Sequence, residues 1–264
     1  MNEVNLIDSH CHLIFENFEK DIENVALRWR SNGVKKLLHA CVDLSEIPKL
    51  KNISDRFSEV FYSVGLHPLD AEKWGPESKD ILKNAVKKDN KILAIGELGL
   101  DLYKSSNYDV QIKALIPQME LAYELNLPVI IHCRDAALEL ISLCKELKKN
   151  NRCPGGVLHC WSGSPEEMRE FLDLGFYISF SGIVTFPKAY KTHECAKLVP
   201  SNKYLIETDA PFLAPVPFRG KRNEPAFVEN VAKTIASLRE STFSKIANES
   251  TRNAEDLFKF GLVN

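Results

Sequence analysis

The sequence predicts an α/β protein of a single domain, with a (β/α)₈ barrel as the leading architecture and a doubly wound open sheet as the alternative. Three observations favour this fold class. Short apolar segments alternate with amphipathic ones along the chain. Eight such apolar segments are present, and 264 residues is a typical length for one barrel. No long linker, low-complexity tract or repeat divides the sequence, so we expect one domain over residues 1–264.

The eight predicted strands are continuous apolar runs rich in β-branched and aromatic residues. Such runs are typical of strands that are buried on both faces of a parallel sheet. Gly, Pro or polar residues flank most of them, so each strand is expected to end in a turn. The predicted strands lie at 4–8, 35–42, 60–66, 91–96, 127–133, 155–160, 175–180 and 203–208.

The segments between the strands have the pattern of amphipathic helices. We predict helices at 18–32, 45–57, 77–89, 108–126, 135–150, 164–174, 224–240 and 251–260, with a less regular segment at 186–199. Ser45 and Asp135 are the predicted N-caps of two of these helices. A loop rich in proline at 210–225 follows the last strand, so it would lie at the end of the barrel that carries active sites.

Composition narrows the function classes. The net charge is -2, so no general basic field attracts nucleic acid, and any site for a polyanion must be a local patch. No run of about 18 apolar residues and no secretory signal is present, so we expect no membrane association. The sequence also gives no sign of an obligate protein partner. The seven scattered cysteines, without a C-x-x-C pair, favour a reduced, cytoplasmic environment.

Histidines and acidic residues stand at the ends of five predicted strands. In a barrel these strand ends meet at one rim, so the side chains would converge there. His10 and His12 are two residues apart and therefore share a strand face. The pattern predicts a metal centre whose candidate ligands are His10, His12, Glu97, His132, His159 and Asp209.

The number of candidate ligands favours two divalent ions. Four imidazoles and two carboxylates exceed what one tetrahedral ion needs, and they suit two ions that share a carboxylate. Glu97, flanked by Gly96 and Gly99, is the expected bridge, and Asp209 is the candidate general base. One ion is assigned to His10, His12, Glu97 and Asp209, and the other to Glu97, His132 and His159. Imidazoles favour Zn²⁺ or Mn²⁺ and carboxylates favour Mg²⁺, so the identity of the metal stays open.

Several further residues are candidate substrate contacts. His67 ends the third predicted strand and would face the same rim. Arg134 and Trp161 follow the fifth and sixth strands, where a guanidinium can grip phosphate and an indole can stack on a base. The loop after the last strand adds the basic residues Arg219, Lys221 and Arg222. Alternatively, Trp161 only closes the top of the barrel, and the basic residues belong to a solvated loop with salt bridges and do not contact substrate.

Three other residues are interpreted by their position alone. His39 lies inside an apolar run and is predicted to be a core histidine, whereas His193 lies in a polar segment and is predicted to be on the surface. Glu207 shares a strand face with Asp209, so it is a candidate to support a ligand from behind.

Together these motifs resemble those of the TatD family of metal-dependent deoxyribonucleases, which are amidohydrolase-like barrels. The matching motifs are IDSHCHL (7–13), SVGLHP (63–68), IGELGLD (95–101), LPVIIHCRDA (127–136), LHCWSGS (158–164), IETDAPFLAP (206–215), RGKRNEP (219–225) and TRNAEDLF (251–258). Leu102 stands where many members carry an aromatic residue, and Trp161 where phenylalanine is frequent. The resemblance implies a TIM barrel, the same six metal ligands, and hydrolysis of DNA from 3′ to 5′ at single-stranded ends, with RNA as a further substrate.

Two alternative functions stay open at this point. The first is a small-molecule metallohydrolase of the amidohydrolase or phosphotriesterase type. Many such enzymes bridge their metals with a carboxylated lysine, whereas this chain has Glu97 at that position. The second is a non-catalytic protein that binds nucleic acid and is stabilised by metal, although the complete set of six ligands gives no reason to expect lost catalysis.

Overall fold

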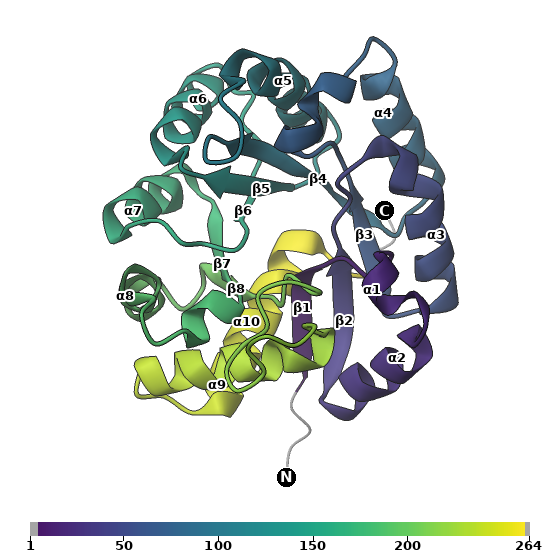
Figure 1. The fold of residues 1–264 in the computed structure, drawn as a ribbon. Helices are drawn as coiled ribbons and strands as arrows, with labels where there is room; N and C mark the ends of the chain where they lie inside the picture. Colours follow the sequence, from purple (N-terminus) through teal and green to yellow (C-terminus); the bar gives the residue numbers. More distant parts are fainter. Residues whose placement is uncertain (1–4, 262–264) are drawn as a thin grey trace.

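The computed structural model describes residues 5–261, and their strands form one parallel sheet in the order of the chain (Figure 1). The eight predicted strands are confirmed, except that residue 4 and the two ends of the predicted 1–264 domain lie outside the described residues. The strands are β1 Leu6–Cys11, β2 Val34–His39, β3 Val60–Val64, β4 Ile92–Asp101, β5 Val129–Arg134, β6 Gly156–Leu158, β7 Tyr177–Phe180 and β8 Tyr204–Ile206.

The sheet closes through residues that directly follow β8. Ala210 pairs with Cys11 in a parallel bridge. The amide of His12 donates to the carbonyl of Ala210 at 2.8 Å, and the amide of Asp209 donates to the carbonyl of His10 at 2.9 Å. The architecture is therefore the predicted barrel and not the open sheet, and the segment after β8 lies beside β1.

Helices surround the barrel (Figure 1). They are α1 Glu16–Glu19, α2 Ile22–Ser31, α3 Ile47–Arg56, α4 Ser78–Lys88, α5 Tyr108–Glu124, α6 Ala137–Lys149, α7 Pro165–Leu174, α8 Tyr190–Leu198, α9 Val228–Leu238 and α10 Phe243–Phe258. Four short 3₁₀ segments accompany them: η1 Leu44–Glu46, η2 Pro68–Lys73, η3 Gly182–Thr185 and η4 Pro225–Phe227. None of the described helices has the length and apolar character needed to cross a membrane.

The boundaries differ from the predictions at several places. The predicted helix at 18–32 is divided into α1 and α2, and α10 begins before residue 251 because the Thr242 hydroxyl caps it by accepting from the amide of Lys245. The predicted N-caps are wrong. Asp43 accepts from the amide of Ser45 at 2.8 Å and caps η1, and the N-cap of α6 is Ala136.

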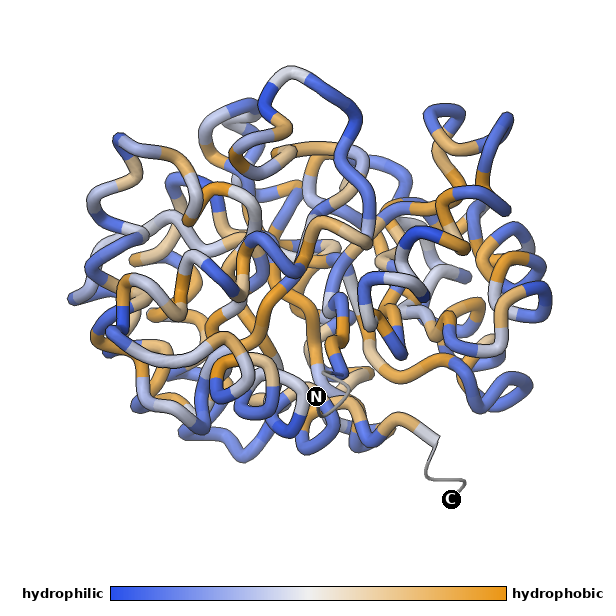
Figure 2. The backbone as a smooth tube through the Cα atoms, turned by 90° about the horizontal axis from the view of Figure 1, so that it is seen from below, coloured by the Kyte–Doolittle hydropathy of each residue, from blue (hydrophilic) through white to orange (hydrophobic). Residues whose placement is uncertain are grey.

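The two ends of the barrel are filled differently. The amino ends of the strands are closed by apolar side chains, among them Ile7 and Leu93, which belong to one buried cluster with Phe258 and Phe260. Figure 2 shows the barrel turned by 90°, with hydrophobic residues along its interior segments and hydrophilic residues on the outer turns. We call the end of the barrel at the amino ends of the strands the lower end and the opposite one the upper end. Because apolar side chains fill the lower end, only the carboxyl ends of the strands are available for a site.

Candidate metal centre

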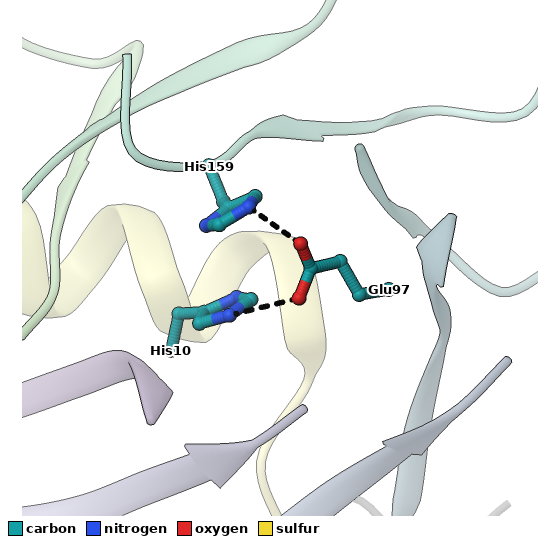
Figure 3. A group of neighbouring side chains, drawn as sticks. All are labelled: His10, Glu97 and His159. Atoms are coloured by element: carbon teal, nitrogen blue, oxygen red, sulfur yellow. Dashed lines mark ion pairs between the residues drawn. The ribbon is translucent and has the colours of Figure 1, made fainter. Parts of the chain in front are cut away.

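The six predicted ligands converge at the carboxyl ends of the strands. His10 lies within β1 and Glu97 within β4, whereas His159 directly follows β6. Figure 3 shows the Glu97 carboxylate beside the two imidazoles, with one oxygen facing each ring; Oε2 is 3.4 Å from His10 Nε2 and Oε1 is 2.9 Å from His159 Nε2. The predicted end of the fourth strand at residue 96 was too early, because β4 continues through Glu97 to Asp101.

Each oxygen of Glu97 faces a different set of imidazoles. Oε1 lies 2.9 Å from His132 Nδ1 in addition to its contact with His159. Oε2 lies 3.4 Å from His10 Nε2 and 3.9 Å from His12 Nε2. A carboxylate with its two oxygens directed to separate groups of nitrogen donors has the arrangement of a bridging ligand.

Asp209 completes the group on the β1 side. Its Oδ1 lies 3.6 Å from His10 Nε2 and 3.5 Å from His12 Nε2. The donor atoms of these three residues all lie within 4.8 Å of one another, and the same holds for His10, Glu97 and His159. The His159 ring is stacked on His10 at 4.0 Å between centroids, and its Nε2 is 3.4 Å from His132 Nδ1. The two predicted ligand groups therefore adjoin.

Two glycines in β4 allow Glu97 to reach this position. A Cβ added to Gly99 would lie 2.0 Å from the carbonyl oxygen of His132, and one added to Gly96 would lie 2.7 Å from the carbonyl oxygen of Ile130. Both glycines have positive φ, 141° and 148°. The G-E-L-G sequence is thus required by the close approach of β4 to β5 on either side of Glu97.

The contacts of His10 and His12 show that the residues fit a cation. Their Nε2 atoms are 3.1 Å apart, and the Nδ1 atoms of both rings are buried without a hydrogen-bond partner among the described residues. Two neutral imidazole nitrogens at this separation repel each other unless a proton or a cation lies between them. Several imidazoles with two carboxylates form a donor set that divalent transition metals prefer. The residues present therefore fit divalent ions.

The electrostatics of the cluster point the same way. Burial disfavours the charged form of Glu97, but the positive charge of His159 and hydrogen bonds from His10 and His132 hold its pKa well below the ordinary value. The pKa of His159 is raised well above the usual range because the charge of Glu97 outweighs the effect of burial. An ionised carboxylate held in the interior by positive charge is the environment that a metal ion also provides.

Two acidic residues orient the histidines from behind. Asp101 Oδ2 accepts from His132 Nε2 at 3.1 Å, which leaves Nδ1 directed toward Glu97. Burial opposes ionisation, yet this hydrogen bond and those from backbone amides lower the pKa of Asp101 to about 2. Glu207 Oε1 lies 3.4 Å from His159 Nδ1, as expected for a supporting residue. Sequence reasoning gave Asp101 no role, although its even spacing from Glu97 along β4 places both on one face.

His67 lies closer to the centre than a substrate contact requires. Its Nε2 is 3.4 Å from Glu97 Oε1, its ring is 4.6 Å from the ring of His132, and its Nδ1 accepts from the amide of Leu69. His67, Glu97 and His132 form a third group whose donor atoms lie within 4.8 Å of one another. The structure therefore adds His67 to the side chains able to hold a metal.

Of the other predicted substrate contacts, only Arg134 lines the cavity above the metal centre. This cavity has a volume of about 550 Å³. Trp161 is only 2% exposed, packs on Phe171 and donates to Cys195 Sγ, so its predicted stacking role is wrong. Arg222 is also excluded as a free phosphate contact, because its guanidinium is paired with carboxylates. These are Asp21 and Glu224, both at 2.7 Å.

The remaining basic loop residues and the two other histidines have separate places. Arg219 lies over the ring of Phe186 at 3.8 Å, and Lys221 is exposed; neither lines the cavity. His39 is buried and accepts from the amide of Ile14, which confirms a core histidine. His193 is half-buried and bonded to the carbonyl of Val184, so it is less exposed than predicted.

A parallel barrel with this set of side chains at its carboxyl end defines a metal-dependent hydrolase. The sequence model of the family described as TatD related DNase matches residues 7–259. An uncharacterized metal-dependent hydrolase, YabD of Bacillus subtilis, is 40% identical over 255 residues. The alignment covers 96% of this chain and 99% of that protein. The chain belongs to the TatD family, and it is a metal-dependent hydrolase that acts on ester bonds.

Two further relatives extend the comparison. A protein named 3′-5′ ssDNA/RNA exonuclease TatD, from Citrobacter koseri, is 32% identical over 259 residues, which cover 96% of this chain and 98% of that protein. The crystal structure of YjjV, a TatD homologue from Escherichia coli K12, has a TM-score of 0.89 at 30% identity. The superposition covers 96% of this chain and 98% of the other.

Proposed function

We propose that this protein is a 3′-5′ exonuclease that removes nucleotides from single-stranded ends of DNA, and also of RNA, with two divalent ions per chain. The observation that carries the proposal is the position of Glu97, with each carboxylate oxygen facing a separate group of imidazoles. The similarity to a protein named as a 3′-5′ ssDNA/RNA exonuclease supports the choice of substrate.

Specific side chains would hold the two ions. His10, His12, Glu97 and Asp209 surround one position, and Glu97, His132 and His159, with His67 beside them, surround the other. Mg²⁺, Mn²⁺ or Zn²⁺ bound there would supply Lewis acidity, both toward the attacking water and toward the phosphoryl oxygens.

The protein's own groups would do the rest. Asp209 lines the cavity, and its side chain is 14% exposed, so a carboxylate oxygen can accept the proton of the attacking water. The hydrogen bond to Asp101 would keep the Nδ1 of His132 directed inward, and the negative charge of Glu207, 3.4 Å from Nδ1 of His159, would favour this ring beside the centre. Arg134 on the cavity wall would offset charge on the phosphate chain.

The test uses protein stripped of metal and resupplied in turn with Mg²⁺, Mn²⁺ and Zn²⁺. The substrate is single-stranded DNA labelled at its 5′ end. A ladder that shortens only with metal is expected, and Glu97→Ala should abolish it. The exposed Glu19→Ala in α1 serves as the matched control and should behave as the unaltered protein does. Circular dichroism establishes that each variant is folded.

The other outcomes assign the alternatives. An intact oligonucleotide with every metal, together with turnover of a lactone or a phosphotriester, would identify a small-molecule metallohydrolase. Tight metal-dependent binding of DNA without cleavage of any ester would identify a non-catalytic binding protein. Either result overturns the nuclease assignment.

A further inference from the structure

The cavity above the metal centre has two chemically different halves. Since the strands follow the order of the chain around a closed ring, the β8–β1 side lies opposite the β4–β5 side (Figure 1). Phe15, after β1, and Phe212, after β8, line the first side. Lys104, after β4, and Arg134, at the end of β5, line the second. Glu97 lies between the two halves.

The aromatic half is built from two rings next to a candidate ligand. Phe15 is stacked on His12 at 5.0 Å between centroids and 8° between planes, and Phe212 meets Phe15 edge to face at 5.9 Å. Phe212 is 52% exposed, so much of its ring faces solvent. Asn223 holds its backbone by donating to the carbonyl of Phe212 at 2.6 Å. A fixed, exposed aromatic ring is a platform on which a base can stack.

The cationic half is positioned by the residue that orients His132. Asp101 Oδ1 accepts from the amides of Tyr103 at 3.1 Å and Lys104 at 2.8 Å, which fixes the turn after β4. The Arg134 guanidinium lies over the Tyr103 ring at 4.2 Å. Neither Lys104 nor Arg134 forms an ion pair with a carboxylate of the described residues, so both charges are available to an anion.

The two halves of the cavity also differ in the elements that surround them. The loop after β8 covers the aromatic side, where Ala210 pairs with Cys11 and Arg222 binds Asp21 at the start of α2 (Figure 1). On the cationic side Tyr103, whose ring lies under the Arg134 guanidinium, is 64% exposed. An exposed ring suits the base at the end of a chain, and two cations without an ion pair among the described residues suit the phosphates that follow it.

We propose that the two halves bind the nucleic acid in one direction. The base of the 3′-terminal nucleotide stacks on Phe212 and Phe15, and the phosphates on the 5′ side of the scissile ester lie along Lys104 and Arg134. This assignment rests on the proposed nuclease function and deepens it, since it gives the terminal base and the phosphates that precede it separate places in the cavity. It also moves the phosphate contacts away from the loop at 219–222.

The first test compares two oligonucleotides that differ only in their 3′-terminal residue, a normal nucleotide or an abasic one. Loss of the terminal base should lower kcat/KM for its release by about tenfold in the unaltered protein. Phe212→Ala should lower kcat/KM for the normal end by a similar factor and make the two ends equivalent. Tyr123→Ala, an exposed aromatic residue of α5 that does not line this cavity, is the control and should keep the tenfold ratio.

The second test measures how kcat/KM falls with salt. Each lost phosphate contact on single-stranded DNA reduces the slope of log kcat/KM against log salt by about 0.7. Lys104→Ala and Arg134→Gln should each show this reduction, whereas the exposed Lys113→Ala on α5 should not. An unchanged slope in both variants, or an equal abasic ratio in Phe212→Ala and the unaltered protein, would overturn the assignment.

Turnover of bis(p-nitrophenyl) phosphate by the unaltered protein separates the two levels of inference. Hydrolysis of this small diester without any cleavage of DNA removes the nuclease function and, with it, the directional site. Cleavage of DNA at the same rate from normal and abasic ends retains the nuclease and removes only the directional site.

Discussion

The lower and upper ends of the barrel use the same strands for opposite purposes. At the lower end, where the amino ends of the strands lie, Ile7, Leu93 and Phe258 fill the interior with apolar atoms. At the upper end of those strands the interior holds ionisable groups, and His10 and Glu97 are 0% and 3% exposed. Burial of charge is costly unless each group has a partner. The difference indicates that the lower end supplies the stability that allows the upper end to hold a charged cluster.

The largest expected effect is a loss of function at the upper end. Glu97→Gln keeps the volume of the side chain but removes the charge that faces both groups of imidazoles. Turnover should fall on the order of 10⁴-fold, because the centre acts as a unit. Metal at about 100 times its dissociation constant should stabilise the unaltered protein by about 2.7 kcal/mol. A thermal melt of Glu97→Gln with and without metal should show no such gain; a full gain would contradict the bridging role.

A substitution at the lower end should lower the stability of the protein and leave its activity unchanged. Phe258 is 2% exposed and closes the bottom of the barrel. Phe258→Ala should lower the free energy of unfolding by about 3–5 kcal/mol, as for other buried phenylalanines. Urea denaturation measures this loss, and the activity per folded molecule should stay unchanged. A parallel loss of kcat would mean that the two ends are not independent.

A smaller effect is expected from the residue behind His132. Asp101→Asn keeps the shape but removes the charge that holds the imidazole and the turn of Lys104. Metal affinity, measured by calorimetric titration, should fall about 10- to 100-fold. Asp109→Asn, an exposed position in α5, is the control. If Asp101→Asn binds metal as the unaltered protein does, His132 needs no support from Asp101.

The smallest effect concerns the loop that covers the aromatic half of the cavity. A hydrogen bond from Arg222 lowers the pKa of Asp21, so this pair contributes stability above the unfolded-state pKa of about 4 and loses it as pH falls through the lower folded value. Asp21→Asn should destabilise by about 0.5 kcal/mol at pH 7, since the pair is partly exposed. The stabilities of the two proteins should converge once the pH falls below the lowered folded-state pKa of Asp21, and a constant difference would rule out this ion pair as the cause.

The sequence was sufficient for the fold and for the place of the six side chains, because both depend on local periodicity. Apolar runs reveal strands, and a histidine at the end of such a run points to the rim wherever the strand lies. The motifs of the TatD family added the reaction class, which residue spacing alone left open.

What sequence reasoning missed depends on partners that are distant along the chain. Arg222 looked like a free cation, but its partner Asp21 is 201 residues away. Trp161 looked like a rim aromatic, but its indole is held by Cys195, 34 residues further on. The free charge of Lys104 was likewise visible only after folding had decided which side chains are neutralised.

The seam that closes the barrel also has a consequence for the order of synthesis. His10 and His12 come from the first strand, whereas Asp209 and Ala210 follow the last, and Asp8 bonds to Thr208 across 200 residues. Contacts of such long sequence separation form only after the intervening chain is present. A growing polypeptide therefore carries two of its six candidate ligands, His10 and His12, through most of its translation without a completed centre, so the hydrolase is inactive until the segment after the last strand has been made.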